Sequence, residues 1–392
     1  MVVRQFNERV VLNELRRLGE ASKADLARRL NITQNAAGQI VRELERQQLI
    51  KTTGKRRGER GQPATILCLD PQGAYSIGVQ VGRRSLDCVL VDFAGKILKA
   101  RRHECAFPAP EEALRLIGQE IATLRRAIPL QGRRHLVGIG VAIPYNLGSW
   151  RRELDIPATA AAAWNDFNLV EELSRVMDVP VFAENDGNAI AVAELFRGHG
   201  RELDDFAVVY LDTAVGGGLV LAGNCRRGAT GNAADFGLML VPPSGLATSP
   251  KPRDNCDILL NRASVAALIR HLQHNRDDIR KNGDLESAIR RFPRLTNEWL
   301  EDCADALVGP LLAISSILDV QAIIIDGNLP RDVIEALTGR LQVLLQGAVP
   351  EARRSPALRV GTLGRDAAAL GAAILPLHSI FDPDMERRFG QR

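Results

Sequence analysis

Apolar side chains recur at helical spacing in three successive stretches of the first fifty residues. The first stretch, 10–18, ends at Gly19; the second begins after Ser22, which has Asp25 three residues later, as in a helix capping box. Thr33 is the expected N-cap of the third stretch. Its apolar positions follow the i, i+3, i+4, i+7 pattern at Ala37, Ile40, Val41 and Leu44. The pattern predicts three helices, the last two joined by a short turn.

Two short β-prone runs, 49–53 and 65–69, follow these helices and flank a basic, glycine-rich loop at 54–63. Three helices followed by such a hairpin predict a winged helix-turn-helix, whose third helix enters the major groove of DNA. The face of that helix opposite its apolar side carries Gln34, Asn35, Gly38, Gln39 and Arg42. Side-chain amides pair bidentately with adenine, and arginine pairs with guanine. The alternative is an ordinary solvated face on a three-helix bundle.

The charge distribution favours DNA. Residues 1–65 hold fourteen Lys and Arg against seven Asp and Glu, whereas the whole chain carries a net charge of +4. A basic module ahead of a slightly acidic remainder indicates that the first meets a polyanion. The loop would neutralise phosphates, and 60–63 would lie in the adjacent minor groove. We expect DNA contacts from Thr33, Gln34, Asn35, Gln39 and Arg42 in the helical part, and from Lys55, Arg56, Arg57, Arg60, Gly61 and Gln62 in the wing.

The remainder of the chain has the pattern of two lobes of related α/β layout. After a turn cluster at 70–73, the pattern predicts strands at 75–81, 86–91 and 96–106, a helix at 110–128 and a strand at 136–143. A similar order recurs with strands at 206–211, 216–221 and 321–326. The two lobes indicate a duplicated nucleotide- or sugar-binding fold with a cleft between them.

Composition excludes several classes of protein. The longest apolar stretch, 307–325, is interrupted by Pro310 and by polar residues, so it predicts a buried helix followed by a strand and no membrane contact. Charges inside the first apolar run argue against a signal peptide, and we expect a cytoplasmic protein. The six cysteines form no C-x-x-C pair. We therefore expect buried free thiols, with no disulfide framework, no metal and no cofactor.

Four segments of the large module resemble the motifs of one known family. Residues 183–189 resemble an E-N-D-A-N motif, and 213–218 resemble a T-G-x-G-G-G phosphate loop. Residues 323–328 resemble an I-V-I-G-G-G segment near an adenosine site, and 366–373 resemble a closing helix. Together, in this order and behind a wing module, they are similar to the ROK family of repressors, open reading frames and sugar kinases. The resemblance implies an α/β fold class: an N-terminal winged helix-turn-helix and an actin-like, sugar-kinase-like two-lobed ROK domain.

The first phosphate loop departs from this resemblance. Family kinases have a D-x-G-x-T pattern there, because phosphoryl transfer needs an anion to hold magnesium. The matching stretch, 80–84, reads Gln-Val-Gly-Arg-Arg, and a neutral amide is a poor magnesium ligand. The resemblance therefore implies a kinase fold without phosphoryl transfer and without catalytic residues. Asp186 matches the family's general base, and we expect it to remain as a sugar-binding residue.

The sugar-contacting and zinc-binding motifs of the family are altered as well. Its E-x-G-H motif reads Asp-Phe-Gly-Leu at 235–238, and its C-x-C-G-x-x-G-C zinc motif falls at 242–256, where Cys256 alone remains. We therefore expect no zinc site. The effector-binding residues that the resemblance implies are Asn165, Asn185, Asp186 and Asp235.

These features together predict three domains. Residues 1–72 form the winged helix-turn-helix, 73–195 the first ROK lobe, to which a C-terminal helix at 375–392 returns, and 196–374 the second lobe. We expect a homodimeric or homotetrameric repressor that binds a double-stranded DNA operator, with its affinity modulated by a sugar or sugar-derived effector. The alternatives are an ATP-dependent sugar kinase with an appended DNA-binding domain, and a sugar-sensing adaptor that docks another protein through its N-terminal bundle.

Overall fold

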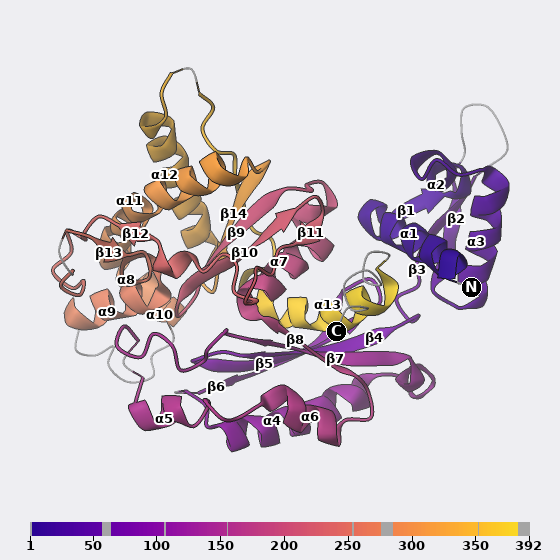
Figure 1. Cartoon of the computed structure of the whole chain (residues 1–392), viewed down its shortest axis with the longest axis horizontal. Coiled ribbons are helices and arrows are strands. Elements are labelled where there is room, and N and C mark those ends of the chain that lie inside the picture. Colours follow the sequence, from indigo (N-terminus) through magenta and orange to yellow (C-terminus); the bar gives the residue numbers. More distant parts are fainter. Residues whose placement is uncertain are drawn as a thin grey trace. The chain divides into compact units, whose positions relative to one another are not determined.

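The computed structural model describes residues 2–56, 64–105, 107–154, 156–252, 255–275, 285–351 and 353–382. By its contacts the chain divides into two compact units (Figure 1). Unit 1 contains Met1–Ile143, Phe167–Glu184 and Ala369–Arg392, and unit 2 contains Pro144–Asp166 and Asn185–Ala368. The chain therefore passes between the units four times. The expected domain boundaries at 72, 195 and 374 stay predictions.

The N-terminal part of unit 1 is a three-helix bundle with a small sheet. The helices are α1 (Val2–Leu18), α2 (Lys23–Arg29) and α3 (Gln34–Arg46). The strands β1 (Glu20–Ser22), β2 (Ile50–Arg56) and β3 (Ala64–Leu69) pair antiparallel in the order β1-β3-β2. The predicted helices and both hairpin strands are confirmed, as is the capping box: Ser22 Oγ accepts from the Asp25 amide at 3.1 Å. The short strand β1 is an addition that sequence periodicity did not predict.

Two details of this part differ from the expectation. Gly38 is buried and Ile40 is only half-buried, so Gly38 belongs to the packed side of α3 and not to its exposed face. The reason is that α3 packs against both α1 and α2, which widens its buried face. The wing residues Arg57, Arg60, Gly61 and Gln62 lie outside the described part of the chain, as does the side chain of Arg56.

A five-stranded sheet with helices on both faces forms the rest of unit 1 (Figure 1). Its strands are β4 (Tyr75–Val81), β5 (Ser85–Asp92), β6 (Ile97–Glu104), β7 (Leu136–Ile143) and β8 (Val181–Asn185), in the order β6-β5-β4-β7-β8. Helices α4 (Pro110–Ala127) and α6 (Leu169–Val176) cover one face, and α13 (Ala367–Phe381) covers the other. The four strands and the helix predicted before residue 144 are all present.

Helix α13 approaches the sheet closely because glycines face it. A Cβ on Gly140 of β7 would lie 1.8 Å from the carbonyl oxygen of Ala372, and one on Gly78 of β4 would lie 2.0 Å from that of Ala369. The Ser76 hydroxyl of β4 donates to the Ala373 carbonyl of the same helix. No side chain fits at either glycine unless the helix moves away from the sheet.

We expect Gly140→Ala to lower the free energy of unfolding by about 2–3 kcal/mol, because the added methyl group displaces a buried helix. Gly118→Ala in α4 is the matched control, since its Cβ would meet nothing within 4 Å. That change should be neutral or stabilising, because alanine favours a helix interior over glycine. Urea unfolding followed by circular dichroism measures both variants, and equal stabilities would show that α13 does not pack on β7 as described.

Unit 2 is built on a second five-stranded sheet, in the order β11-β10-β9-β14-β15. Its strands are β9 (Phe206–Leu211), β10 (Val215–Leu221), β11 (Asn224–Cys225), β14 (Ala322–Gly327) and β15 (Leu358–Val360). The helices include α5 (Ala158–Ala162), α7 (Asp186–Arg197), α8 (Leu260–Ala263), α9 (Val265–Asn275), α10 (Leu285–Arg291), α11 (Pro293–Leu318) and α12 (Arg331–Ala348). A small β12 (Leu240–Val241) and β13 (Asp257–Ile258) ribbon completes the unit.

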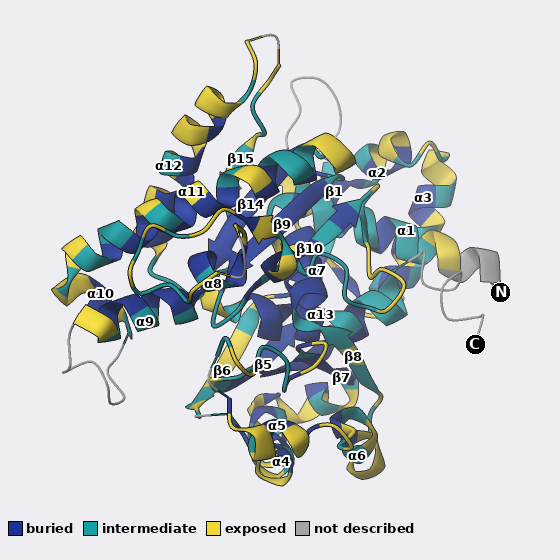
Figure 2. Cartoon of the chain, turned by 60° about the vertical axis from the view of Figure 1, so that its left-hand side comes forward, coloured by how far each residue is buried: buried dark blue, intermediate teal, exposed yellow. Residues whose placement is uncertain are grey.

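The core of unit 2 lies between its sheet and helices α8, α9, α11 and α12. Figure 2 shows β9, β10 and β14 largely in the colour of buried residues. The apolar stretch 307–325 forms the end of α11 and most of β14, as predicted. Within the described residues, no helix has both the length and the apolar character that a membrane crossing requires.

Candidate functional site

The exposed face of α3 carries the candidate DNA contacts. Thr33 caps the helix, with its Oγ1 accepting from the Ala36 amide at 3.2 Å, so its hydroxyl is already engaged in the fold. Four side chains that follow are exposed on one helix: Gln34, Asn35, Gln39 and Arg42. Lys55 is exposed at the end of β2. The helix thus presents amide and guanidinium groups to solvent, the groups that read base edges in a major groove.

Arginines near this face differ in whether an acid neutralises them. Arg28 pairs with Asp25 at 2.6 Å, Arg29 pairs with Glu14, and Arg46 pairs with Glu43. Arg42 makes no ion pair with any residue that the structure describes. Its guanidinium is therefore the one on α3 that needs no acid to be displaced before it contacts a base or phosphate. The Arg28 and Arg46 pairs are local, since each acid lies three residues earlier on the same helix, whereas the Arg29–Glu14 pair depends on the packing of α2 against α1. Sequence analysis did not distinguish these arginines.

A second cluster forms at the N-terminus of α7, in unit 2. Asn185 caps this helix, with its Oδ1 accepting from the amides of Gly187 at 2.8 Å and Asn188 at 3.3 Å. Its Nδ2 donates to Asn232 Oδ1 at 3.2 Å, and Asn232 Nδ2 donates to Asp235 Oδ2 at 3.0 Å. The structure thus joins two predicted effector residues, Asn185 and Asp235, through Asn232, which sequence analysis missed. We define these three residues as the amide–carboxylate cluster.

The backbone that carries this cluster has an irregular shape. Gly228, Gly231 and Ala234 all have positive φ, which folds the segment back toward α7. The fully buried Asn188 fixes it by donating Nδ2 to the Gly231 carbonyl at 3.0 Å. Asn232 and Asp235 are left half-exposed beside the end of the helix. A half-exposed set of amide and carboxylate groups has the donors and acceptors that bind hydroxyls of a small polar molecule.

The other two predicted effector residues stand differently. Asp186, in the first turn of α7, is half-buried, and its Oδ1 accepts from the Gly187 amide at 2.9 Å. Asn165 is exposed in the turn after α5, and its backbone amide donates to the Ala162 carbonyl. No hydrogen bond between Asn165 and the amide–carboxylate cluster occurs within the described chain.

The glycines that resemble a second phosphate loop lie in strand β10. A Cβ on Gly217 would lie 1.8 Å from the Val208 carbonyl oxygen, and one on Gly218 would lie 2.5 Å from the Ala191 Cβ. A Cβ on Gly187 would in turn lie 2.0 Å from the Gly217 carbonyl oxygen. Gly187 and Gly218 are therefore required for the close packing of α7 on β10, whereas Gly217 leaves room for the backbone of β9 and the Phe236 ring. Packing thus accounts for these glycines without a phosphate. At Gly216, by contrast, a Cβ would meet nothing within 4 Å.

The first phosphate loop of the resemblance corresponds to the end of β4 and its turn into β5. Gln80 is buried, and its Oε1 has no hydrogen-bond partner among the described residues. The Gly82 amide donates to the Ser85 carbonyl at 2.9 Å and closes the turn, which places Arg84 on the surface. The strand end thus carries an uncharged side chain, Gln80, beside a turn that contains two arginines.

Two buried carboxylates hold the segment before α13 in unit 2. Asp326 Oδ2 accepts from the amides of Gly364 at 2.9 Å and Leu363 at 3.2 Å, and Glu194 Oε1 accepts from the Thr362 amide at 3.1 Å. Burial raises the pKa of both carboxyls, and the backbone hydrogen bonds oppose this rise. Asp326 lies in the segment 323–328 that was expected to resemble the adenosine-site motif, and its carboxylate is buried.

We expect Glu194→Gln to gain stability relative to the wild type as the pH rises. Because the pKa of Glu194 is raised in the folded state, the carboxyl stabilises the fold fully below its ordinary pKa of 4.5. This contribution to the free energy of unfolding is lost as the pH rises through the folded-state pKa. Glutamine does not ionise, so its variant does not lose stability in this way. Its amide nitrogen cannot accept the hydrogen bond that one of the two carboxylate oxygens accepts in the wild type. Urea unfolding from about pH 4 to about pH 8 measures the difference. A difference that stays constant over this range would contradict the raised pKa.

Comparison with known proteins gives the same two modules that the structure shows. The sequence profile of the ROK family matches residues 76–378, and that of a winged helix DNA-binding domain matches residues 6–61. The xylose repressor of Bacillus spizizenii is 23% identical over 380 residues, which cover 97% of this chain and 97% of the repressor.

Two solved structures share the fold. The crystal structure of a ROK family transcriptional regulator, a homologue of the E. coli MLC protein, aligns with a TM-score of 0.70 at 20% identity over 99% of both chains. A ROK family glucokinase from Streptomyces griseus, in complex with glucose and AMPPNP, aligns with a TM-score of 0.61 at 23% identity over 77% of this chain and 99% of that chain.

A DNA-binding winged helix joined to an actin-like, sugar-kinase-like domain defines a class of two-module proteins. The ROK profile spans most of the chain, and the chain belongs to the ROK family. Its winged helix DNA-binding domain precedes the ROK domain.

Proposed function

We propose that this protein is a transcriptional repressor that binds a double-stranded DNA operator and releases it in response to a sugar or sugar-derived effector. The observation that supports the DNA half is the exposed face of α3, a capped helix that carries Gln34, Asn35, Gln39 and Arg42. Arg42 has no ion-pair partner in the described part of the chain. The wing residues Arg56, Arg57, Arg60, Gly61 and Gln62, together with Lys55, add phosphate and minor-groove contacts. Such a protein acts where the DNA is, in the cytoplasm.

The effector half rests on the amide–carboxylate cluster. Asn185, Asn232 and Asp235 form a hydrogen-bonded row of two amides and one carboxylate, and Asp186 lies next to it in the chain. Hydroxyl groups of a sugar both donate and accept, so they pair with such a row better than an apolar ligand does. We assign Asn165 a contact with the sugar at the edge of this site. The name of the xylose repressor relative supports a sugar as the class of effector.

Phosphoryl transfer is not assigned to this protein. Gln80, at the position that the resemblance gives to the first phosphate loop, offers no negative charge for magnesium. Asp186 then serves as a binding residue, with no proton to abstract for a transfer. The related glucokinase fold supports the kinase ancestry of the domain and nothing more about its present chemistry.

The assembly that fits this function is a homodimer or homotetramer. Two winged helices related by a two-fold axis read a pseudo-palindromic operator, with half-sites about one helical turn apart or a multiple of it. Sedimentation of the protein with a selected duplex gives the stoichiometry that checks this.

The test of the function starts with the full-length protein and a pool of genomic fragments. Selection at about 0.15 M salt should enrich a pseudo-palindromic duplex, and its affinity should fall steeply as salt rises. A panel that contains D-xylose, D-glucose, N-acetylglucosamine and their 6- or 5-phosphates is then added to the complex, and thermal shift identifies the sugar that binds. Failure to enrich any duplex would refute the DNA half. Steady conversion of ATP and a sugar to ADP and a sugar phosphate would refute the sensing half.

A further inference from the structure

A buried arginine lies at the centre of the second lobe. Arg262 of α8 has 2% of its surface exposed, and its guanidinium donates to both carboxylate oxygens of Asp302, at 2.7 and 3.1 Å, and to Asp305 Oδ2 at 2.9 Å. It also donates to the Pro242 carbonyl at 2.9 Å. Burial alone would lower the pKa of Arg262, but the bonds to the two carboxylates raise it above its ordinary value. The arginine therefore stays charged and ties the segment after β12 to α11.

Two further links hold the same segment. The Ser244 hydroxyl donates to Asp302 Oδ1 at 2.8 Å and accepts from the Leu246 amide at 3.0 Å. Arg270 Nε of α9 donates to the Thr248 carbonyl at 3.0 Å, and Thr248 Oγ1 is hydrogen-bonded to His271 Nδ1 at 2.9 Å. We call the segment 242–249 the pinned loop, because α8, α9 and α11 each hold it by at least one side chain.

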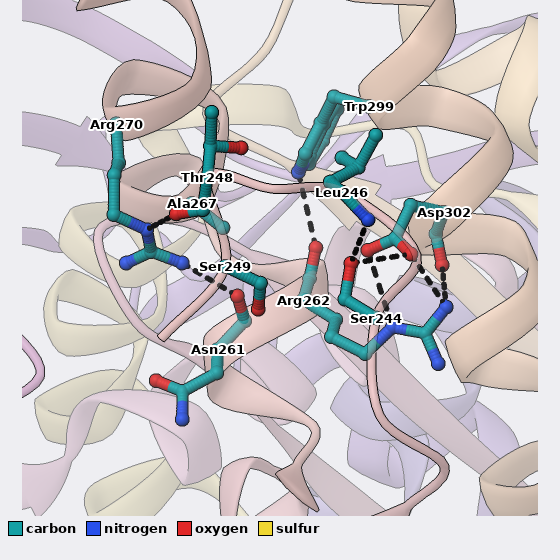
Figure 3. A pocket seen from close by; sticks show the side chains of 10 residues that line it. All are labelled: Ser244, Leu246, Thr248, Ser249, Asn261, Arg262, Ala267, Arg270, Trp299 and Asp302. Atoms are coloured by element: carbon teal, nitrogen blue, oxygen red, sulfur yellow. Dashed lines mark hydrogen bonds and ion pairs between the residues drawn. The ribbon is translucent and has the colours of Figure 1, made fainter. Parts of the chain in front are cut away.

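Figure 3 shows these side chains around a small polar cavity. Arg262 and Asp302 meet on one side of it, and Arg270 reaches toward Thr248 and Asn261 on the other. The cavity has a volume of about 10 Å³, which is room for a single water molecule. Ser249 Oγ and Asn261 Oδ1, which belong to residues that line the cavity, are buried and have no partner in the described chain. A cavity of this size does not hold an effector.

The pinned loop falls where the family resemblance places a structural zinc. Leu238 stands at the position of the family's zinc-binding histidine. Of the family's three zinc-binding cysteines, Cys256 alone remains, and it is exposed. Across the described ranges, no three His, Cys, Asp or Glu residues group in a way that could hold a metal ion. These residues do not fit a zinc ion, which needs four nitrogen or sulfur ligands in a structural site.

We propose that the network of Arg262, Arg270 and Thr248–His271 takes the place of a metal ion as the staple of this loop. The staple also reaches the candidate effector site: the Leu259 amide, three residues before Arg262, donates to the Met239 carbonyl at 2.9 Å. Met239 follows the 3₁₀ turn Phe236–Leu238, whose N-cap is Asp235. The staple is therefore linked through backbone hydrogen bonding to the segment that carries Asp235, and the importance of this link for an effector rests on the proposed effector site.

The first test measures metal dependence. The full-length protein is purified without added metal, analysed for zinc by mass spectrometry, and melted with and without 1,10-phenanthroline. The network predicts zinc far below one ion per chain and the same melting temperature in both samples. One zinc ion per chain, with a lower melting temperature after chelation, would overturn the proposal.

The second test measures the staple itself by hydrogen–deuterium exchange. Arg262→Lys keeps the charge but loses the planar fork that reaches Asp302, Asp305 and Pro242 together. We expect amide exchange in 239–249 to be faster by about tenfold or more, and the melting temperature to fall by about 5–10 °C. Arg290→Lys is the matched control, because Arg290 is exposed and, among the described residues, forms an ion pair with Glu286 of its own helix alone. It should leave both quantities unchanged.

A milder variant keeps the test decisive if Arg262→Lys does not fold. Thr248→Val removes the hydroxyl that meets His271 and leaves both arginines in place. It should raise exchange at 246–249 alone. Unchanged exchange of the loop in both variants would overturn the staple. Neither test uses a sugar or DNA, so a protein that binds no sugar would refute the proposed function and leave this result standing.

Discussion

Replacing Gln39 and Arg42 together by alanine is expected to weaken binding to the selected duplex by about 100- to 1,000-fold. Both side chains are exposed on the same face of α3, and each bidentate contact to a base edge contributes about 1–3 kcal/mol. The loss should also relax the base preference at the positions that the two side chains read, because the remaining contacts are to phosphates. Fluorescence anisotropy at about 0.15 M salt, with the selected duplex and with single-base variants of it, measures both effects.

Arg46→Ala is the matched control for this experiment. Arg46 lies on the same helix and carries the same charge, but Glu43 pairs with it. A surface ion pair contributes little, so the affinity should change by less than about fivefold. Lys55→Ala in the wing should give a third result, which is weaker binding to all sequences alike. The slope of log affinity against log salt concentration should fall by about one, because one fewer counterion is released. Equal losses in all three variants would show that α3 contributes charge alone and does not read bases.

Asp235→Ala is expected to weaken effector binding by about 100-fold or more while leaving affinity for DNA intact. A carboxylate that accepts from two sugar hydroxyls contributes about 1.5–3 kcal/mol per hydrogen bond. Its removal also frees Asn232 Nδ2, which the Asp235 carboxylate now orients at 3.0 Å. The variant should therefore stay bound to its operator when the identified sugar is added. Calorimetry with the sugar and anisotropy with the duplex separate the two properties.

Asp235→Asn and a distant variant complete this series. Asparagine keeps the shape and one acceptor oxygen, so its affinity should lie between those of the wild type and the alanine variant. Asp332→Asn changes an exposed acid in α12, and it should bind the sugar as the wild type does. If Asp235→Ala bound the sugar with unchanged affinity, the effector site would have to lie elsewhere in the ROK domain.

The sequence was sufficient for features that depend on neighbours within a few residues. The caps Ser22 and Thr33 and the strands 75–81 and 206–211 are where the local pattern predicted them. A capping side chain reaches an amide three residues away, and a buried strand shows as a short apolar run, so both are encoded locally. The family motifs added the identity of the fold, an actin-like ROK domain, to the two lobes that the pattern predicted.

The tertiary structure decided which distant residues meet. Asn185 and Asn232 are 47 positions apart, and Arg262 and Asp302 are 40 apart, so no local pattern couples them. It also decided why Gly140 is a glycine: helix α13 lies too close to β7 for a side chain. Spacing along the chain determines hydrogen bonds and burial within one helix or strand. The partners of a buried charge, and the contacts of a glycine backbone, are set only when separate elements pack against each other. The local sequence does not determine that packing.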